Sequence, residues 1–171
     1  MIVFIIQMIV VMFSNKRVRQ RSHVPNDARQ TVLEKSIGPI ANFAWLLALG
    51  YSIFLPLILG TIWFYIGFFV FICGTLLLSF ATYSFIITPT DQLIQEGVYA
   101  FSRHPMYLAT FFICLGTGIA TASWILILLS IIIAICLKFE ASLEERYCRN
   151  IYGDVYEEYM EKVPRWFGIS K

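Results

Sequence analysis

Charged residues are scarce in this sequence, and two long stretches have none. Asp, Glu, Lys and Arg make up 14% of the 171 residues, whereas a soluble domain carries about 25%. None of them occurs between Lys35 and Asp91, or between Arg103 and Lys138. Because 58% of the residues are hydrophobic, the chain cannot cover itself with polar surface. We therefore expect a multi-pass integral membrane protein with a single domain over residues 1–171.

The sequence also lacks features that are typical of disulfide-bonded, metal-binding and nucleic-acid-binding proteins. The four cysteines form no CxxC pair and three of them lie in apolar runs, which favours buried thiols over a disulfide or a metal site. The net charge of +2 is too small to indicate a nucleic-acid partner. We expect no metal and no nucleic acid.

The first three apolar stretches predict three membrane spans. Met1–Phe13 is followed, not preceded, by the basic segment 14–36, so we expect an uncleaved anchor whose amino terminus lies outside the cytoplasm. The next two spans are predicted at Ile37–Leu59, with a bend at Pro56, and at Ile62–Ile87.

The segment Met106–Leu137 can form either one helix or a hairpin. A single helix would be about 48 Å long, which exceeds a hydrocarbon core of about 30 Å. A hairpin that turns within Gly116–Ser123 gives five crossings and keeps all 13 Lys and Arg on one side. A single helix would move six of the 13, from Lys138 onward, to the other face. The positive-inside rule therefore favours the hairpin and a cytoplasmic carboxy terminus.

The tail that follows is predicted to form two amphipathic helices. Between residues 147 and 163 hydrophobic residues recur with a helical period, with charged residues between them. We expect Gly153 to end the first helix and Pro164 to end the second. Asp154 and Glu157 have the spacing of a capping box. Such helices suit a cytoplasmic lid against the membrane interface.

Two polar clusters flank the second uncharged stretch. The first is Gly97–Tyr107, and the second is Glu140–Arg146. Glu140 and Glu144 share one helix face directly after a span, where a carboxylate needs a cation. The helix start that follows Arg103 offers free amide groups to an anion. We predict that the clusters meet at the membrane surface and bind a small ligand with both charges, such as S-adenosylmethionine.

The same residues resemble the isoprenylcysteine carboxyl methyltransferase family, whose wider group includes phospholipid N-methyltransferases. The resemblance runs from Leu93 to Arg165, in matching order and spacing. It rests on Gly97-Val98-Tyr99, Arg103-His104-Pro105-Met106-Tyr107, Glu144-Glu145, Tyr152–Tyr159 and Val163-Pro164-Arg165. It implies a membrane methyltransferase that uses S-adenosylmethionine and a lipophilic or lipidated acceptor. That acceptor would be an isoprenylcysteine-like carboxylate, or a phospholipid amine or thiol, delivered through membrane lipid.

The resemblance also implies roles for particular residues. The cofactor would be bound by Leu93, Ile94, Tyr99, His104, Pro105, Met106, Tyr107 and Glu144, the first two largely through their backbone. Apart from the resemblance, the chemistry of the two polar clusters makes Arg103, Glu140 and Glu144 the candidate catalytic residues. Residues 1–87 would provide three spans, and residues 88–171 the cofactor-binding loop, the hairpin and the lid.

One position departs from the family pattern. Family members that act on prenylcysteine carboxylates carry an arginine one turn before the first glutamate, and this chain has Glu140 there. A carboxylate would repel a carboxylate acceptor and would suit an amine or an uncharged thiol. Lys138 points about 200° away from Glu140 around the helix. Whether oxygen, nitrogen or sulfur is methylated stays open at this stage.

Two further hypotheses compete with methyl transfer. Membrane sterol reductases, which use NADPH, have a carboxy-terminal region of similar layout. A non-catalytic membrane subunit or a small transporter would also be apolar, although the spans contain no Asp, Glu, Lys or Arg for a translocation path. A soluble-type methyltransferase is excluded, because strands and helices do not alternate and no Gly-rich loop follows a strand.

Overall fold

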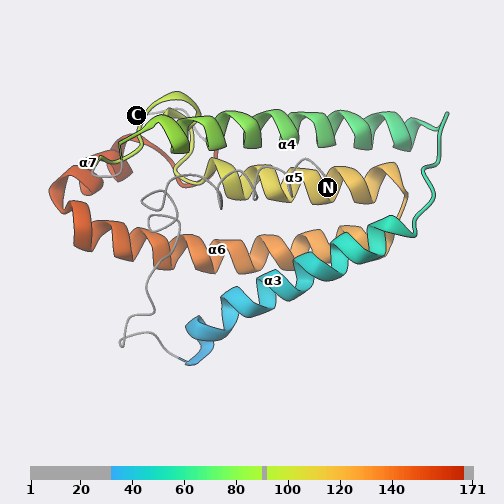
Figure 1. Cartoon of the computed structure of the whole chain (residues 1–171), viewed down its shortest axis with the longest axis horizontal. Helices are drawn as coiled ribbons and strands as arrows, with labels where there is room; N and C mark the ends of the chain where they lie inside the picture. The colour runs from blue at the N-terminus through green and yellow to red at the C-terminus, as the bar shows by residue number, and fades with distance from the viewer. Residues whose placement is uncertain (1–31, 90–91, 168–171) are drawn as a thin grey trace.

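The computed structural model describes residues 32–89 and 92–167, and all the regular elements within these ranges are helical. They are α3 (Val32–Ile53), α4 (Ile62–Ile87), the 3-10 helix η1 (Gly97–Ala100), α5 (Pro105–Ala120), α6 (Trp124–Tyr152) and α7 (Asp154–Lys162) (Figure 1). The predicted all-α class is confirmed for this part of the chain. The predicted anchor Met1–Phe13 lies outside the described residues.

Three helices are long and apolar enough to cross a membrane: α3 over Ser36–Ile53, all of α4, and α6. The apolar helix α5 has 16 residues, or about 24 Å. Large hydrophobic side chains such as Phe43, Phe69 and Ile131 are exposed on the bundle surface. Such a surface suits lipid rather than water.

The predicted hairpin is confirmed, with α5 and α6 as its two arms. The chain turns at residues 121–123, where Ala122 adopts a φ of 46°. Ser123 caps the start of α6, and its hydroxyl accepts a hydrogen bond from the Leu126 amide. The two arms run in opposite directions (Figure 1), and the longer α6 runs back past the start of α5.

The predicted bend of the first described span at Pro56 is wrong. Helix α3 ends at Ile53, and Pro56 lies in the non-helical connection to α4. Proline donates no backbone hydrogen bond and disfavours helical geometry in the residue before it, so the helix stops short of it. A different proline, Pro39, lies inside α3. The bounds predicted for α4 are confirmed.

The tail differs from its prediction at two points. Helix α6 continues without a break from Trp124 to Tyr152, so the charged segment after the hairpin extends the second arm. Gly153, with a φ of 53°, separates α6 from α7 as predicted. The predicted cap by Asp154 is wrong, because Gly153 precedes the helix and no side chain caps it. Helix α7 ends at Lys162, before Pro164.

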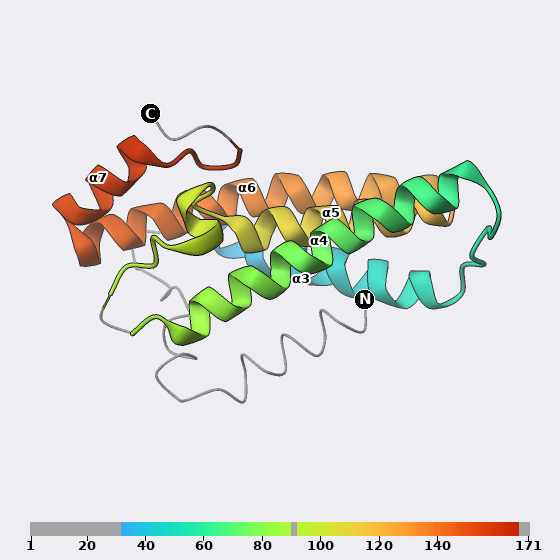
Figure 2. The same ribbon diagram turned by 90° about the horizontal axis from the view of Figure 1, so that it is seen from above.

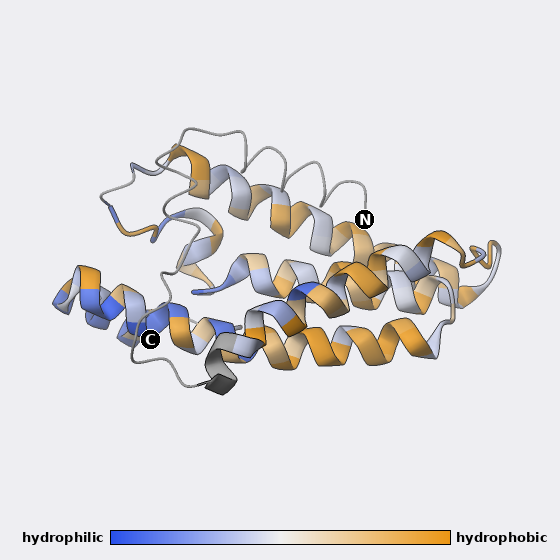
Figure 3. Ribbon diagram, turned by 60° about the horizontal axis from the view of Figure 1, so that its bottom comes forward, coloured by the Kyte–Doolittle hydropathy of each residue, from blue (hydrophilic) through white to orange (hydrophobic). Residues whose placement is uncertain are grey.

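The bundle has one charged end and one uncharged end. The connections at residues 54–61 and 121–123 lie at one end and contain no charged residue. The start of α5, the end of α6 and α7 lie at the other end, at the left of Figures 1 and 2. The hydrophilic residues gather there in Figure 3. This arrangement agrees with the one-sided charge distribution on which the hairpin was predicted.

Helices α4 and α5 pack closely because glycines line their contact. A Cβ atom on Gly74 would lie 2.9 Å from the Ile113 amide nitrogen, and one on Gly116 would lie 2.5 Å from the Phe71 amide nitrogen. A Cβ on Gly67 would overlap the backbone of Ala120. Small residues let helix backbones approach in this way within a membrane. This packing holds α5, and hence its amino-terminal end, against α4.

We predict that Gly67→Ala lowers the free energy of unfolding by about 1–3 kcal/mol, because the methyl group forces the two backbones apart. Gly50→Ala is the matched control, since a Cβ at Gly50 in α3 would meet nothing within 4 Å. It should stabilise the protein by about 0.5–1 kcal/mol. Denaturant titration in detergent micelles measures both changes. Equal effects of the two substitutions would contradict the close α4–α5 contact.

Candidate active site

The polar cluster Gly97–Tyr107 is held between α4 and α7. Gly97 has a φ of 65°, and a Cβ there would lie 2.9 Å from the Ser84 hydroxyl of α4. The buried Tyr159 hydroxyl of α7 donates a 2.7 Å hydrogen bond to the Tyr99 carbonyl. The loop is thereby fixed on both sides before it enters α5.

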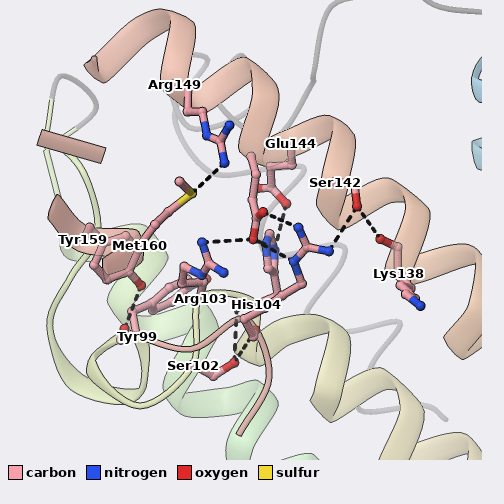
Figure 4. Close-up of polar contacts among 12 residues, drawn as sticks. Tyr99, Ser102, Arg103, His104, Lys138, Ser142, Glu144, Arg149, Tyr159 and Met160 are labelled. Carbon is pink, nitrogen blue, oxygen red and sulfur yellow. Dashed lines mark hydrogen bonds and ion pairs between the residues drawn. The ribbon is translucent and has the colours of Figure 1, made fainter. Parts of the chain in front are cut away.

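His104 lies directly before α5 and is buried. Its Nε2 is 3.2 Å from Glu145 Oε1, and its Nδ1 is 3.3 Å from Glu144 Oε2. The ring stacks on Tyr107 with a centroid distance of 5.3 Å and an interplanar angle of 5°. The ring of Trp166 lies 5.9 Å away. The two polar clusters that the sequence predicted to meet therefore do meet (Figure 4).

The charge on His104 follows from these contacts. Burial lowers the pKa of His104, but the hydrogen bonds and charges of Glu144 and Glu145 outweigh it, so the pKa is raised above its usual value of 6.5. A larger share of His104 is protonated at neutral pH than of a free histidine. The site thus presents a partly cationic imidazole at the start of α5.

Glu145 is the most densely bonded residue among those described at this end of the bundle. Its carboxylate is buried and accepts hydrogen bonds from His104 and Arg165, the latter through Nε at 3.0 Å and through Nη2. Arg103 Nη1 lies 3.4 Å from the same carboxylate. Sequence reasoning gave no role to Glu145 or to Arg165, although both belong to the motifs that carry the family resemblance.

Glu144 is placed differently from its neighbour. Its side chain is 40% exposed and forms an ion pair with His104. Consecutive helical residues point about 100° apart, so Glu145 turns inward and Glu144 stays at the rim. The carboxylate of Glu144 is thus partly accessible from outside the bundle, and its role as a contact for a cationic ligand stays a prediction.

Glu140 lies one turn before Glu144 and faces α3. Its Oε1 is 3.5 Å from where a Cβ of Gly38 would lie. The side chain is half-buried, and no Lys or Arg among the described residues forms an ion pair with it. A half-buried carboxylate without a cation is costly, which makes Glu140 a candidate contact for a cationic group that is not part of the described chain.

The remaining predicted cofactor contacts lie around this centre. Ile94 and Tyr99 are buried together against Ala81, and Leu93 packs against the tyrosine cluster of α7. Pro105 is fully buried. Met106 packs between the α4 and α5 core clusters.

Two polar features at the start of α5 have unused hydrogen-bonding capacity. His104, which precedes α5, provides no side-chain cap, Pro105 has no N–H, and the Tyr107 and Leu108 amides donate to the His104 carbonyl, so the Met106 amide is the donor left in this turn. The Nε atom of Arg103 is buried and has no hydrogen-bond partner among the described residues. Both features are donors, and together with His104 they suit an anionic group such as a carboxylate.

Comparisons with known proteins agree with the resemblance seen in the sequence. The phospholipid methyltransferase family matches residues 55–155, more than half of the chain. A protein-S-isoprenylcysteine O-methyltransferase of Schizosaccharomyces pombe (strain 972 / ATCC 24843) is 36% identical over 73 residues. That match covers 42% of this chain and 31% of the yeast protein. Both findings favour methyl transfer over the reductase and the non-catalytic alternatives.

We predict that Glu145→Gln lowers the free energy of unfolding by about 2–4 kcal/mol, because it leaves buried cations without their counter-charge. Glu144→Gln should cost less than about 1 kcal/mol, since that carboxylate is partly exposed to water. Denaturant titration of both variants in the same detergent compares them. Equally small losses would show that Glu145 does not hold this site together.

Proposed function

This chain belongs to the phospholipid methyltransferase family. From this premise we propose that it is a membrane methyltransferase that transfers the methyl group of S-adenosylmethionine to a lipophilic acceptor, which arrives through the membrane. The observation that carries the proposal is the contact between His104 and the pair Glu144-Glu145 at the charged end of the bundle. That contact puts anion-binding and cation-binding groups within the reach of one small molecule.

The described residues fit S-adenosylmethionine. The amino-acid carboxylate would be held by the Met106 amide at the start of α5, by His104 and by the unpaired Nε of Arg103. The partly exposed carboxylate of Glu144 would face an ammonium or sulfonium group. The stacked rings of His104 and Tyr107 provide an aromatic wall near these groups. When bound, S-adenosylmethionine supplies an electrophilic methyl group on a positively charged sulfur.

Catalysis would rest on positioning rather than on a strong acid or base. His104 and Arg103 orient the donor, and the apolar bundle excludes water from the reacting groups. A carboxylate or thiolate acceptor needs no proton removed, whereas an amine must lose one. We propose Glu140 or Glu144 as the group that accepts that proton, because the Glu145 carboxylate is already bound by His104, Arg103 and Arg165.

The acceptor is proposed from the position of Glu140. The side chain lies where the apolar part of α6 gives way to its charged part, one turn before Glu144. An acceptor that enters from lipid toward Glu144 would pass it. Its half-buried carboxylate favours a cationic or neutral head group, and hence an amine or thiol over an isoprenylcysteine carboxylate. We further propose that this end of the bundle faces the cytoplasm.

We predict that Glu144→Gln weakens the binding of S-adenosylmethionine about tenfold or more, because a charge-assisted hydrogen bond contributes about 1.5–3 kcal/mol. Isothermal titration calorimetry with the full chain in detergent measures the affinity. Glu157→Gln is the matched control, since Glu157 is exposed on α7 and should bind the cofactor like the wild type. The same affinity in all three proteins would remove Glu144 from the cofactor site.

We predict that Glu140→Arg moves acceptor preference toward carboxylates by about tenfold or more in relative kcat/KM, because like charges placed together cost several kcal/mol. The assay follows radiolabelled S-adenosylmethionine with membrane lipid amines, small thiols and prenylcysteine analogues. The variant Glu140→Gln removes the negative charge without adding a positive one, and so shows which part of the change in preference comes from losing the carboxylate alone. An unchanged acceptor ranking would dissociate Glu140 from acceptor choice, and transfer to no acceptor would contradict the proposed function itself.

A further inference from the structure

The residues after α7 form a strap, defined here as Val163–Phe167, that lies across the His104 site. The Arg103 amide donates a 3.1 Å hydrogen bond to the Pro164 carbonyl. The Ser102 hydroxyl donates to the Arg165 carbonyl at 3.2 Å. The strap backbone is thus paired with the residues directly before His104, which fixes where the Arg165 side chain begins.

The Arg165 side chain binds both oxygens of Glu145. Its Nε donates to Oε1 at 3.0 Å, and its Nη2 donates to Oε2. Its Nη1 also donates to the Ser142 hydroxyl at 3.2 Å. A planar guanidinium bound in this way fixes the plane of a carboxylate. Arg103, which lies 3.4 Å from Oε1 through one nitrogen, does not impose the same constraint.

The oxygen that Arg165 fixes is the one that contacts the histidine. Glu145 Oε1 lies 3.2 Å from His104 Nε2 and 3.0 Å from Arg165 Nε. We propose that Arg165 is a positioning residue that acts through Glu145 to set the orientation and the proton affinity of His104. This inference rests on the proposed function, in which His104 binds the donor.

The effect on protonation has a definite sign. Arg165 places a positive charge beside the Glu145 carboxylate. Its Nε and the Nε2 of His104 both contact Oε1 of that carboxylate, so the two residues compete for this oxygen. Removing that charge should make His104 easier to protonate. Several charged and titratable groups surround His104. They are Arg103 directly before it, Tyr107 in the first turn of α5, Glu144 and Glu145 from α6, Arg165 from the strap, and Tyr156 and Tyr159 from α7. Of these groups, Arg165 is the cation that binds both oxygens of Glu145.

The sequence makes the direct measurement simple, because the chain contains two histidines, His23 and His104. Isotope labelling of histidine gives two imidazole signals in an NMR spectrum of the full chain in micelles, and His23→Gln assigns them. We expect Arg165→Met to move the His104 titration midpoint upward by about half to one pH unit. The control Lys162→Met removes a tail cation that pairs with the exposed Glu158 at 3.7 Å, and it should leave the midpoint unchanged.

A second variant tests the orienting role and guards against misfolding of the first. Arg165→Lys keeps the charge but not the planar fork, so the His104 midpoint should stay close to that of the wild type while the affinity for S-adenosylmethionine falls about tenfold. An unmoved midpoint in Arg165→Met, or wild-type affinity in Arg165→Lys, would overturn the inference. Failure of the wild type to bind S-adenosylmethionine would instead contradict the proposed function. The NMR comparison does not depend on that binding and would still show whether Arg165 affects the protonation of His104.

Discussion

The candidate active site depends on the contacts that the buried carboxylate of Glu145 makes with His104 and two arginines. This carboxylate joins His104 and Arg103, which come before α5, to Arg165, which comes after α7. A carboxylate in this position is strongly unfavourable unless it is paired, and here it is paired with segments far apart in the sequence. The site therefore assembles when both segments are in place, so docking of the tail and formation of the His104 site are coupled.

The bundle serves to bring these segments to one place. The α5–α6 hairpin returns the chain to the end where α5 begins, and the continuous helix α6 carries Glu140, Glu144 and Glu145 past that point. Glycines between α4 and α5 allow close packing that fixes the start of α5. The outer surface is apolar and suits lipid, while the polar chemistry is confined to the charged end. In the proposed function, this would separate the polar groups of the donor from the path of a lipophilic acceptor.

Much of this arrangement could be predicted from the sequence, because a membrane restricts the choices. Charge counting distinguished a hairpin from a single helix over Met106–Leu137, since only one of them keeps the basic residues together. Other features depend on tertiary contacts. Two adjacent glutamates look equivalent in a sequence, and the contact of the strap with Glu145 decides which of them is buried. The continuity of α6 was missed because the change from apolar to charged residues suggested a boundary, although no Gly or Pro interrupts the helix before Gly153.

The most direct test of the central claim is an experimental structure of the full chain with S-adenosylhomocysteine, the product form of the proposed donor. We predict that the adenosyl ligand lies at the charged end of the bundle and contacts both His104 and Glu144, with its carboxylate toward the start of α5. A ligand bound at the opposite end, near residues 54–61 and 121–123, or one that contacts neither His104 nor Glu144, would contradict the assignment of the donor site.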